Sequence, residues 1–237
     1  MAKLVLVWTC ALILPNLCFR SGRRYNTHCT ELKTVSGGVI KWVNCCRYLG
    51  VFFNSGSTFK CNVDNAKSCF FKAFNALFSK VGRLASEEVV LNLTRVKCLP
   101  ILLYATEACP LLSRNRQSLE FTVNRLFMKL FRTSSSAIVK CCQLAFNFLP
   151  INSQLDIRTA KFLQKFIVSE NSLCNLFSIN ARRKLDELFA RYNNVTTACQ
   201  LHNVIYDNND SFVCSNNLTY KLYFRILCYI LFCLPMF

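Results

Sequence analysis

The sequence has few of the residues on which enzyme active sites most often depend. Only two histidines, His28 and His202, occur in 237 residues, which leaves little material for a histidine-based catalytic triad. It contains no glycine-rich phosphate loop, no HExxH zinc motif and no GxSxG nucleophile elbow. We therefore expect both histidines to be ordinary polar residues. The adjacent acids Asp186 and Glu187 project in different directions on a helix, so we expect a solvated surface there rather than an acid–base pair.

Acidic side chains are also scarce. Twelve Asp and Glu stand against 29 Lys and Arg, which gives a formal net charge of +17. Such an excess favours phosphate backbones or anionic membrane surfaces as partners. No long run of Lys or Arg is present, so folding must gather the basic groups if they form one surface. A generally solvated basic surface is the alternative.

Cysteine, in contrast, is abundant, with 16 residues. Two accounts compete: disulfides in a secreted protein, or reduced thiols in a cytosolic or nuclear one. There is no C-x-x-C pair, and the doublets Cys45-Cys46 and Cys141-Cys142 suit neither a zinc knuckle nor a regular disulfide ladder. We interpret most of these cysteines as buried thiols. A metal site built from distant thiols is the alternative.

Both ends of the chain are hydrophobic. Residues 4–19 are uncharged, follow Lys3 and are broken by Pro15, a pattern similar to a signal peptide. No clear small-x-small cleavage site follows, and neither this stretch nor residues 226–237 reaches the roughly 20 residues that span a bilayer. We favour a nuclear or cytoplasmic location. The alternative is a small secreted or membrane-associated basic protein, in which the Asn-x-Ser/Thr sequons would become glycosylation sites.

Periodicity indicates a short β region followed by helices. Residues 39–53 form two β-prone runs, with Gly50 permitting a bend. Beyond them, apolar residues such as Phe70 and Phe74 recur at helical spacing. The run from Ile101 to Pro110 is ambiguous between helix and strand, and we favour helix. We also predict helices over residues 64–84, 86–98, 113–131, 137–148, 154–169 and 178–192, and a loop or poorly ordered link over 193–217.

Two of these helices carry specific expectations. Ser86 followed by two glutamates predicts a helix start, and Pro100 predicts where that helix stops. Arg125, Lys129 and Arg132 follow one another at spacings of four and three. These spacings place the three cations on one helix face, which can follow a phosphate backbone. An ordinary solvated helix face is the alternative.

The helix predicted over residues 113–131 is also expected to be amphipathic. Ser113 can cap its N-terminus, and its apolar residues form a broad stripe that should face a core. The members of that stripe are Leu119, Val123, Leu126, Phe127, Leu130 and Phe131.

Four sequence blocks are similar to one known family. They are YLGV at 48–51, SEEVV at 86–90, KCLPILLYATEACPL at 97–111 and VNRLFMKLFRT at 123–133. In this order they resemble the reverse transcriptases of non-LTR (LINE-type) retrotransposons, downstream of the palm. The similarity runs from about Cys18 to Ser178, roughly two thirds of the chain.

The resemblance implies a fold and a set of contact residues. The YLG segment resembles the end of the palm near the primer terminus, so Tyr48, Leu49 and Gly50 would contact nucleic acid. The helices that follow resemble the thumb, whose contact with the duplex backbone would fall to Arg125, Lys129 and Arg132. We expect a mainly α fold: a thumb-like helical bundle preceded by a small β-hairpin remnant of a palm domain. The expected division is 1–25 unassigned, 26–60 β remnant, 61–192 helical region and 193–237 loop and hydrophobic tail.

The resemblance also implies that catalytic residues are missing. In this family, magnesium ions are held by aspartates of a Tyr-x-Asp-Asp type motif upstream of YLG. Here the only acidic residue before Tyr48 is Glu31, and the first aspartate is Asp64. We therefore expect no bound cofactor, no catalytic or metal residue, and a truncated reverse transcriptase fragment inactive on its own. Its expected partners are RNA or DNA, bound weakly; a membrane is the alternative, and the oligomeric state is left open.

Overall fold

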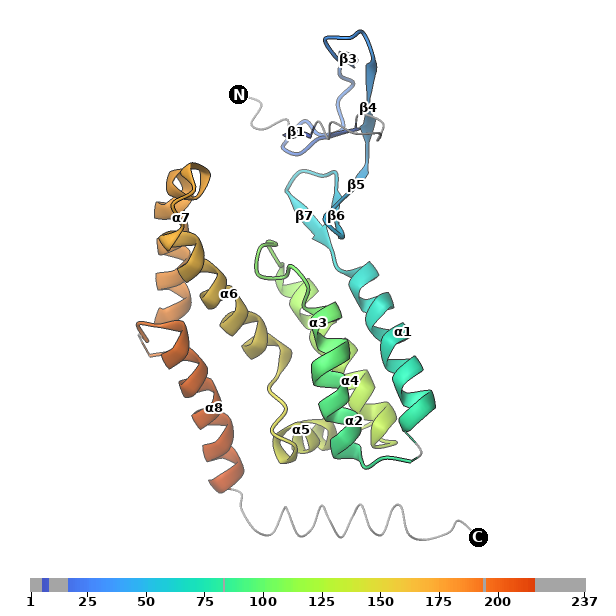
Figure 1. The fold of residues 1–237 in the computed structure, drawn as a ribbon, viewed down its shortest axis with the longest axis vertical. Helices are drawn as coiled ribbons and strands as arrows, with labels where there is room; N and C mark the ends of the chain where they lie inside the picture. Colours follow the sequence, from blue (N-terminus) through green and yellow to red (C-terminus); the bar gives the residue numbers. More distant parts are fainter. Residues whose placement is uncertain (1–5, 9–16, 83, 194, 216–237) are drawn as a thin grey trace. The chain divides into compact units, whose positions relative to one another are not determined.

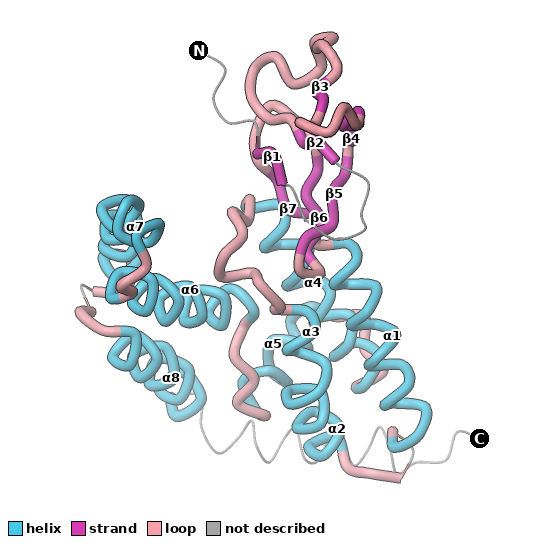
Figure 2. The backbone as a smooth tube through the Cα atoms, turned by 45° about the horizontal axis from the view of Figure 1, so that its top comes forward, coloured by secondary structure: helices cyan, strands magenta, loops and turns pink. Residues whose placement is uncertain are grey.

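A computed structural model describes residues 6–8, 17–82, 84–193 and 195–215. Short strands come first and helices follow (Figures 1 and 2), so the prediction of a mainly α fold is confirmed. Contacts divide the chain into two compact units. Unit 1 comprises Met1–Arg83 with Val90–Gln117, and unit 2 comprises Leu84–Val89 with Ser118–Phe237. The helices predicted over residues 61–192 are thus shared between two units.

Unit 1 begins with two small sheets. The first has the order β1-β2-β4-β3, in which β2 and β4 run parallel and the other pairs antiparallel. The second, β5-β6-β7, is wholly antiparallel. The predicted β region over 39–53 is confirmed by β4, β5 and β6, whereas the other strands have two or three residues each and too little pattern to predict. The strands are β1 (Leu6–Trp8), β2 (Leu17–Phe19), β3 (Leu32–Lys33), β4 (Val39–Val43), β5 (Cys45–Tyr48), β6 (Val51–Asn54) and β7 (Lys60–Asn62).

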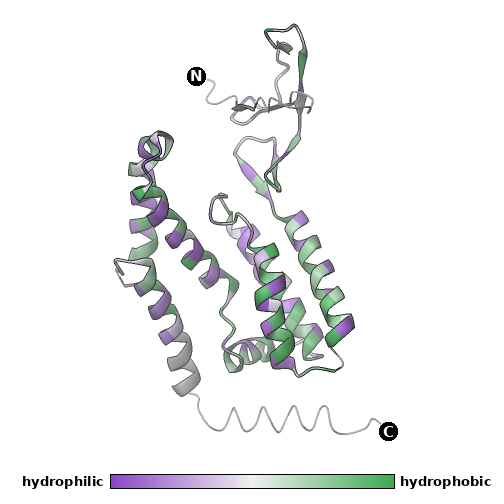
Figure 3. Cartoon of the chain, viewed as in Figure 1, coloured by the Kyte–Doolittle hydropathy of each residue, from purple (hydrophilic) through white to green (hydrophobic). Residues whose placement is uncertain are grey.

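The helical part of unit 1 is built around α1 (Asp64–Val81). This helix buries Phe70 and Phe74, which confirms the helix predicted from residue 64 onward. It packs against the π-helical turn η1 (Thr94–Cys98) and against α3 (Leu99–Leu102), and α2 (Glu87–Leu93) leads into both. Apolar and polar residues alternate along these helices (Figure 3), as expected when one face of each helix is buried.

Pro100 does not end the second helix, so that prediction is wrong. Helical structure continues from α2 through η1 to the end of α3, and Pro100 lies in the first turn of α3. The N–H of Leu99 bonds to the Thr94 carbonyl, five residues back, which widens the helix just before the proline. Pro100 is thus accommodated at the point where the helix changes from π-helical to α-helical hydrogen bonding.

The helix favoured for the run from Ile101 to Pro110 is wrong beyond Leu102. The chain turns instead, and Ala105 adopts a left-handed conformation with φ of 56°. The Thr106 hydroxyl donates to the Leu103 carbonyl at 2.9 Å, which closes the chain on itself. Leu102 and Leu103 remain buried, so the apolar run contributes to the core without continuing as a helix.

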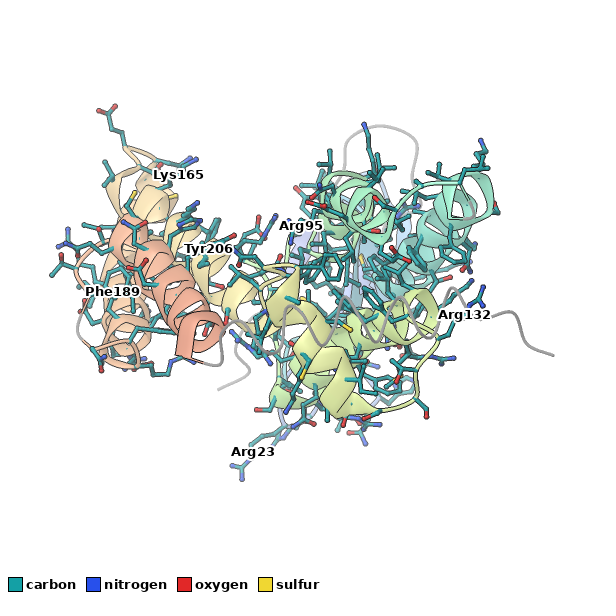
Figure 4. All side chains as sticks on the ribbon, turned by 90° about the horizontal axis from the view of Figure 1, so that it is seen from below. Arg23, Arg95, Arg132, Lys165, Phe189 and Tyr206 are labelled. Carbon is teal, nitrogen blue, oxygen red and sulfur yellow. The ribbon has the colours of Figure 1, made fainter. Side chains whose placement is uncertain are left out.

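Unit 2 consists of helices. The predicted apolar stripe of α4 is buried throughout, which confirms its orientation toward a core. Helix α6 packs against α7 and α8, and α5 also packs against α8. Phe189 of α7 belongs to this core, and the partly buried Tyr206 of α8 packs against it (Figure 4). The helices are α4 (Ser113–Leu130, in unit 2 from Ser118), α5 (Ser136–Ala145), α6 (Ile151–Val168), α7 (Ser172–Ala190) and α8 (Ala198–Ser215).

Two predicted boundaries at the end of unit 2 are wrong. Helix α7 begins at Ser172, six residues before the predicted start, and α8 occupies most of the predicted loop over 193–217. The Asn-rich composition concealed α8, whose Leu201 and Ile205 are buried one helical turn apart. The Thr197 hydroxyl accepts the N–H of Gln200 at 3.1 Å and caps the helix. Tertiary packing here outweighs the low helix propensity of asparagine.

The cysteines are less buried than predicted. Of the 11 cysteines whose environment is described, only Cys61, Cys98 and Cys142 are buried, and all 11 are free thiols. The interpretation of most cysteines as buried thiols is therefore wrong for this part of the chain. Among the described residues, no helix has both the length and the apolar character needed to cross a membrane. The apolar segment at 226–237, and all of 4–19 except two short strands, lie outside the described residues.

Candidate nucleic-acid interface

The Tyr48-Leu49-Gly50 segment forms the tight turn between β5 and β6. Tyr48 pairs with Val51 across the hairpin, so Leu49 and Gly50 are the two central residues. Both have positive φ angles, 46° for Leu49 and 82° for Gly50, which is the geometry of a type I′ turn. Glycine adopts such angles readily, but leucine does so at an energetic cost.

This turn is held by a side chain from a distant part of unit 1. The Tyr104 hydroxyl donates a hydrogen bond to the Leu49 carbonyl at 3.1 Å. A Cβ atom at Gly50 would lie 3.4 Å from the Tyr104 ring, so the ring lies close against the turn. The unusual conformation of Leu49 therefore has an external support, as strained backbone requires.

The turn presents apolar surface to solvent. Leu49 is 70% exposed and Tyr48 is 39% exposed. Next to them, the Arg47 guanidinium lies 5.6 Å from the centre of the Phe52 ring, and Arg47 is itself exposed. An exposed aromatic ring beside a cation can stack on a base or sugar while the cation meets a phosphate. The turn is thus chemically suited to a nucleotide contact.

The predicted basic face begins on α4. Arg125 and Lys129 are both exposed and lie four residues apart, so they project from the same side of the helix. Opposite them, Val123 and Phe127 are fully buried. The buried stripe therefore fixes the helix rotation and turns the two cations to solvent.

Arg132 lies beyond the helix rather than on its face. Helix α4 ends at Leu130, and Arg132 has a left-handed φ of 49°. The N–H of Thr133 bonds back to the Met128 carbonyl at 3.0 Å, which is the Schellman arrangement, with Arg132 in the position that glycine usually occupies. Arg132 is exposed (labelled in Figure 4).

One exposed residue of this surface was not predicted. Phe121 is 56% exposed and lies four residues before Arg125 on α4. The exposed residues Phe121, Arg125 and Lys129 thus follow one line along the helix, and Arg132 lies just past its end; we call these four residues the α4 surface. The sequence could have revealed it. Phe121 falls outside the predicted apolar stripe of this helix, so its aromatic side chain could have been predicted to be exposed.

Neighbouring helices fix the position of α4 in unit 2. The Phe127 ring meets Phe148 edge-on with 5.0 Å between centroids, and the Gln143 amide donates to the Asn124 side chain at 2.9 Å. These contacts join α4 to α5 and to the segment that follows α5. Side chains on the opposite face of α4 are therefore presented by a packed scaffold.

Glu120 is the one acidic residue of α4. Glu120 accepts the backbone N–H of Asn152 at 3.2 Å at the start of α6. Burial raises the pKa of Glu120, although the N–H groups of Asn152 and Ile151 and the charge of Lys140 act in the opposite direction. Four basic residues share α4 with this one carboxylate, so the helix carries a net positive charge.

The paired acids and the histidines are the remaining residues that the sequence raised as candidates. In the described ranges, no group of three or more His, Cys, Asp or Glu side chains could hold a metal ion. Asp186 and Glu187 are both exposed, as predicted, and Glu187 lies 3.8 Å from Arg183. The His202 ring stacks near Tyr206 at 4.4 Å. The turn belongs to unit 1 and the α4 surface to unit 2, so each is a separate candidate contact.

Comparisons of the chain with protein-family models, with curated proteins and with solved structures found no match. The family resemblance therefore depends on the four sequence blocks.

Proposed function

We propose that this chain is the post-palm fragment of a LINE-type reverse transcriptase and that it binds a nucleic-acid duplex weakly through the α4 surface. The observation that carries the proposal is the exposed line of Phe121, Arg125 and Lys129, continued by Arg132. Regularly spaced cations meet successive phosphates, and an exposed ring supplies a stacking or sugar contact. Because α4 is already packed in unit 2, it presents the cations and the ring without a further loss of backbone entropy on binding.

The hairpin turn adds a second proposed contact. Tyr48 and Leu49 are exposed at a turn whose backbone is held by Tyr104, and rigid positioning lowers the entropy lost when a partner binds. In the resemblance, the same residues lie near the primer terminus. We propose the turn as a nucleic-acid contact of unit 1, separate from the contact that the α4 surface of unit 2 makes with a duplex backbone.

Polymerisation is not part of the proposed activity. The reaction needs two metal ions held by carboxylates, and the residues here do not fit that role: Glu31 is the only acid before Tyr48. In the resemblance, the four sequence blocks lie after the catalytic motif of the enzyme. The purified chain should therefore fail to extend an annealed primer in magnesium, and extension would overturn the proposal.

Salt dependence tests the binding surface. Each phosphate contact contributes about 0.9 to the slope of log K against log salt for a B-form duplex. Changing Arg125, Lys129 and Arg132 together to alanine should lower the slope by about 2.7, three times that contribution. Affinity for an RNA–DNA hybrid and for a DNA duplex would be measured by fluorescence anisotropy over a range of salt concentrations.

The chain offers a matched control on another helix of unit 2. Arg182, Arg183 and Lys184 of α7 are also exposed, so their replacement by alanine removes the same charge from a different surface. The control should retain most of the wild-type slope. Equal losses in both triple variants would mean that net charge alone drives binding, and the α4 surface would lose its assigned role.

A localisation experiment separates this proposal from the secreted alternative. Cell fractionation combined with a glycosidase shift would detect passage through the secretory pathway, because the sequons are modified only there. We expect an unglycosylated protein in the nuclear or cytoplasmic fraction. A glycosylated, secreted product would reject the retrotransposon assignment and favour a basic extracellular protein.

A further inference from the structure

Two thiols from distant segments of unit 1 meet in one cavity. Cys61 belongs to β7, and Cys109 belongs to the irregular segment after α3. The two side chains lie close enough for the Cys61 and Cys109 thiols to interact. Both residues line a cavity of about 380 Å³, so a reagent can approach the pair without unfolding the unit.

The two thiols have different exposure and opposite pKa shifts. Cys61 is 6% exposed, whereas Cys109 is half-buried. Interaction with the Cys109 side chain raises the pKa of Cys61, and burial and the negative charge of Cys109 raise it further. The same interaction lowers the pKa of Cys109, although burial and the Glu107 carboxylate oppose the change. Cys109 is therefore the more accessible thiol of the pair and the one that more readily becomes a thiolate.

We propose that Cys61 and Cys109 are a modification site that forms a reversible disulfide by exchange with a small disulfide such as oxidised glutathione. The Cys109 thiolate attacks one sulfur of the small disulfide, which breaks its S–S bond and releases one thiolate. Cys61 then gives its proton to the released thiolate and attacks the Cys109 sulfur, which releases the second thiolate; this thiolate takes up from solvent the proton that Cys109 lost. The two cysteines are oxidised together and one small disulfide is reduced to two thiols.

Other nearby cysteines differ in ways that serve as internal controls. Cys69 of α1 also lines this cavity, so it serves as the matched control for the pair. Cys98 is 1% exposed, and burial raises its pKa, so it should remain reduced. The exposed thiols of Cys45, Cys141 and Cys199 should react as single thiols and form mixed disulfides with glutathione.

The disulfide would fasten a segment that also supports the hairpin turn. Cys109 follows Tyr104 in the same irregular segment, and Tyr104 donates to the Leu49 carbonyl. Linking Cys109 to β7 restrains this segment against the sheet that contains the turn. Formation of the disulfide does not require nucleic-acid binding, so it stands or fails separately from the proposed function.

Peptide mapping tests the proposal on the full chain. Reduced protein is incubated with mixtures of reduced and oxidised glutathione, alkylated in acid, and digested by trypsin without reduction. We expect a disulfide-linked species that joins residues 61–67 to residues 98–114. Fragmentation, together with a Cys98→Ser variant, distinguishes Cys109 from Cys98 as the linked residue.

Three variants test the order of the two steps. Cys61→Ser should lose the linked species and trap glutathione on Cys109, whereas Cys109→Ser should leave Cys61 reduced. The matched control Cys69→Ser should retain the link. Wild-type protein in which Cys61 and Cys109 both remain alkylatable, after Cys45, Cys141 and Cys199 have reacted fully, would overturn the proposal. A stable glutathione adduct on wild-type Cys109 without the link would overturn it as well.

Discussion

Replacing Arg132 with glycine separates the charge of the α4 surface from the stability of the helix that presents it. Arg132 adopts a left-handed φ of 49° at the end of α4, where a non-glycine residue costs roughly 1–2 kcal/mol. Glycine removes that strain, but it loses about 0.5–1 kcal/mol through the greater entropy of the unfolded chain. The expected net result is a gain of about 0–1.5 kcal/mol in the free energy of unfolding.

The same substitution should weaken binding to a duplex. Removing one phosphate contact lowers the salt slope by about 0.9, which would be measured by fluorescence anisotropy beside denaturant unfolding. Asn147→Gly is the matched control, because Asn147 has a φ of 46° after α5 and carries no charge. Its stability gain should be smaller, since asparagine tolerates this conformation, and its binding should not change. A stabilised Arg132→Gly variant with wild-type affinity and slope would refute the assignment of Arg132 to the interface.

Three further predictions concern the core and pH dependence of unit 2. Tyr192→Phe removes a 2.9 Å hydrogen bond to the buried carboxylate of Asp156 and should cost about 1.5–3 kcal/mol in urea unfolding; a loss below about 0.5 kcal/mol would contradict that bond. Leu201→Ala creates a cavity at a fully buried position of α8 and should cost about 2–5 kcal/mol, whereas the exposed Cys199→Ala should change stability by less than about 0.5 kcal/mol. Because the pKa of Glu120 is raised in the folded state, its contribution is fully present below the unfolded pKa and is lost as pH rises through the folded pKa. The stability of Glu120→Gln relative to wild type should therefore increase from about pH 4 toward neutral pH, and a constant difference would contradict the assigned shift.

Long amphipathic segments could be predicted from the sequence because their spacing records the packing. Helix α4 is an example: six apolar positions at helical spacing predicted a stripe that is buried in the structure. Phe121 lay outside that stripe, and its exposure followed from the same periodicity once the helix was fixed. The end of the helix was harder to predict. The position just after a helix is usually glycine, and here it is Arg132.

The errors arose where contacts distant in sequence outweigh local preference. Pro100 is accommodated because the preceding turn is π-helical, and no local rule predicts that widening. Helix α8 contains many asparagines, yet Leu201 and Ile205 bury against the core of unit 2. The meeting of Cys61 with Cys109 was equally hidden, since no motif spacing connects β7 to the segment after α3.

Three residues with a left-handed backbone conformation lie within the sequence blocks that resemble the reverse transcriptase family. Leu49, Ala105 and Arg132 all have positive φ angles without being glycine, and each lies inside one of the four blocks on which the family resemblance rests. Such conformations persist when surrounding contacts impose them. Leu49 is tied by the Tyr104 hydroxyl, and Arg132 sits within a helix-ending hydrogen-bond pattern. Both residues therefore adopt a conformation that costs energy for a residue other than glycine, and both side chains are exposed to solvent. Strained backbone that surrounding contacts maintain is a reason to test function at a position, so Leu49 and Arg132 are the first two positions to test for a partner.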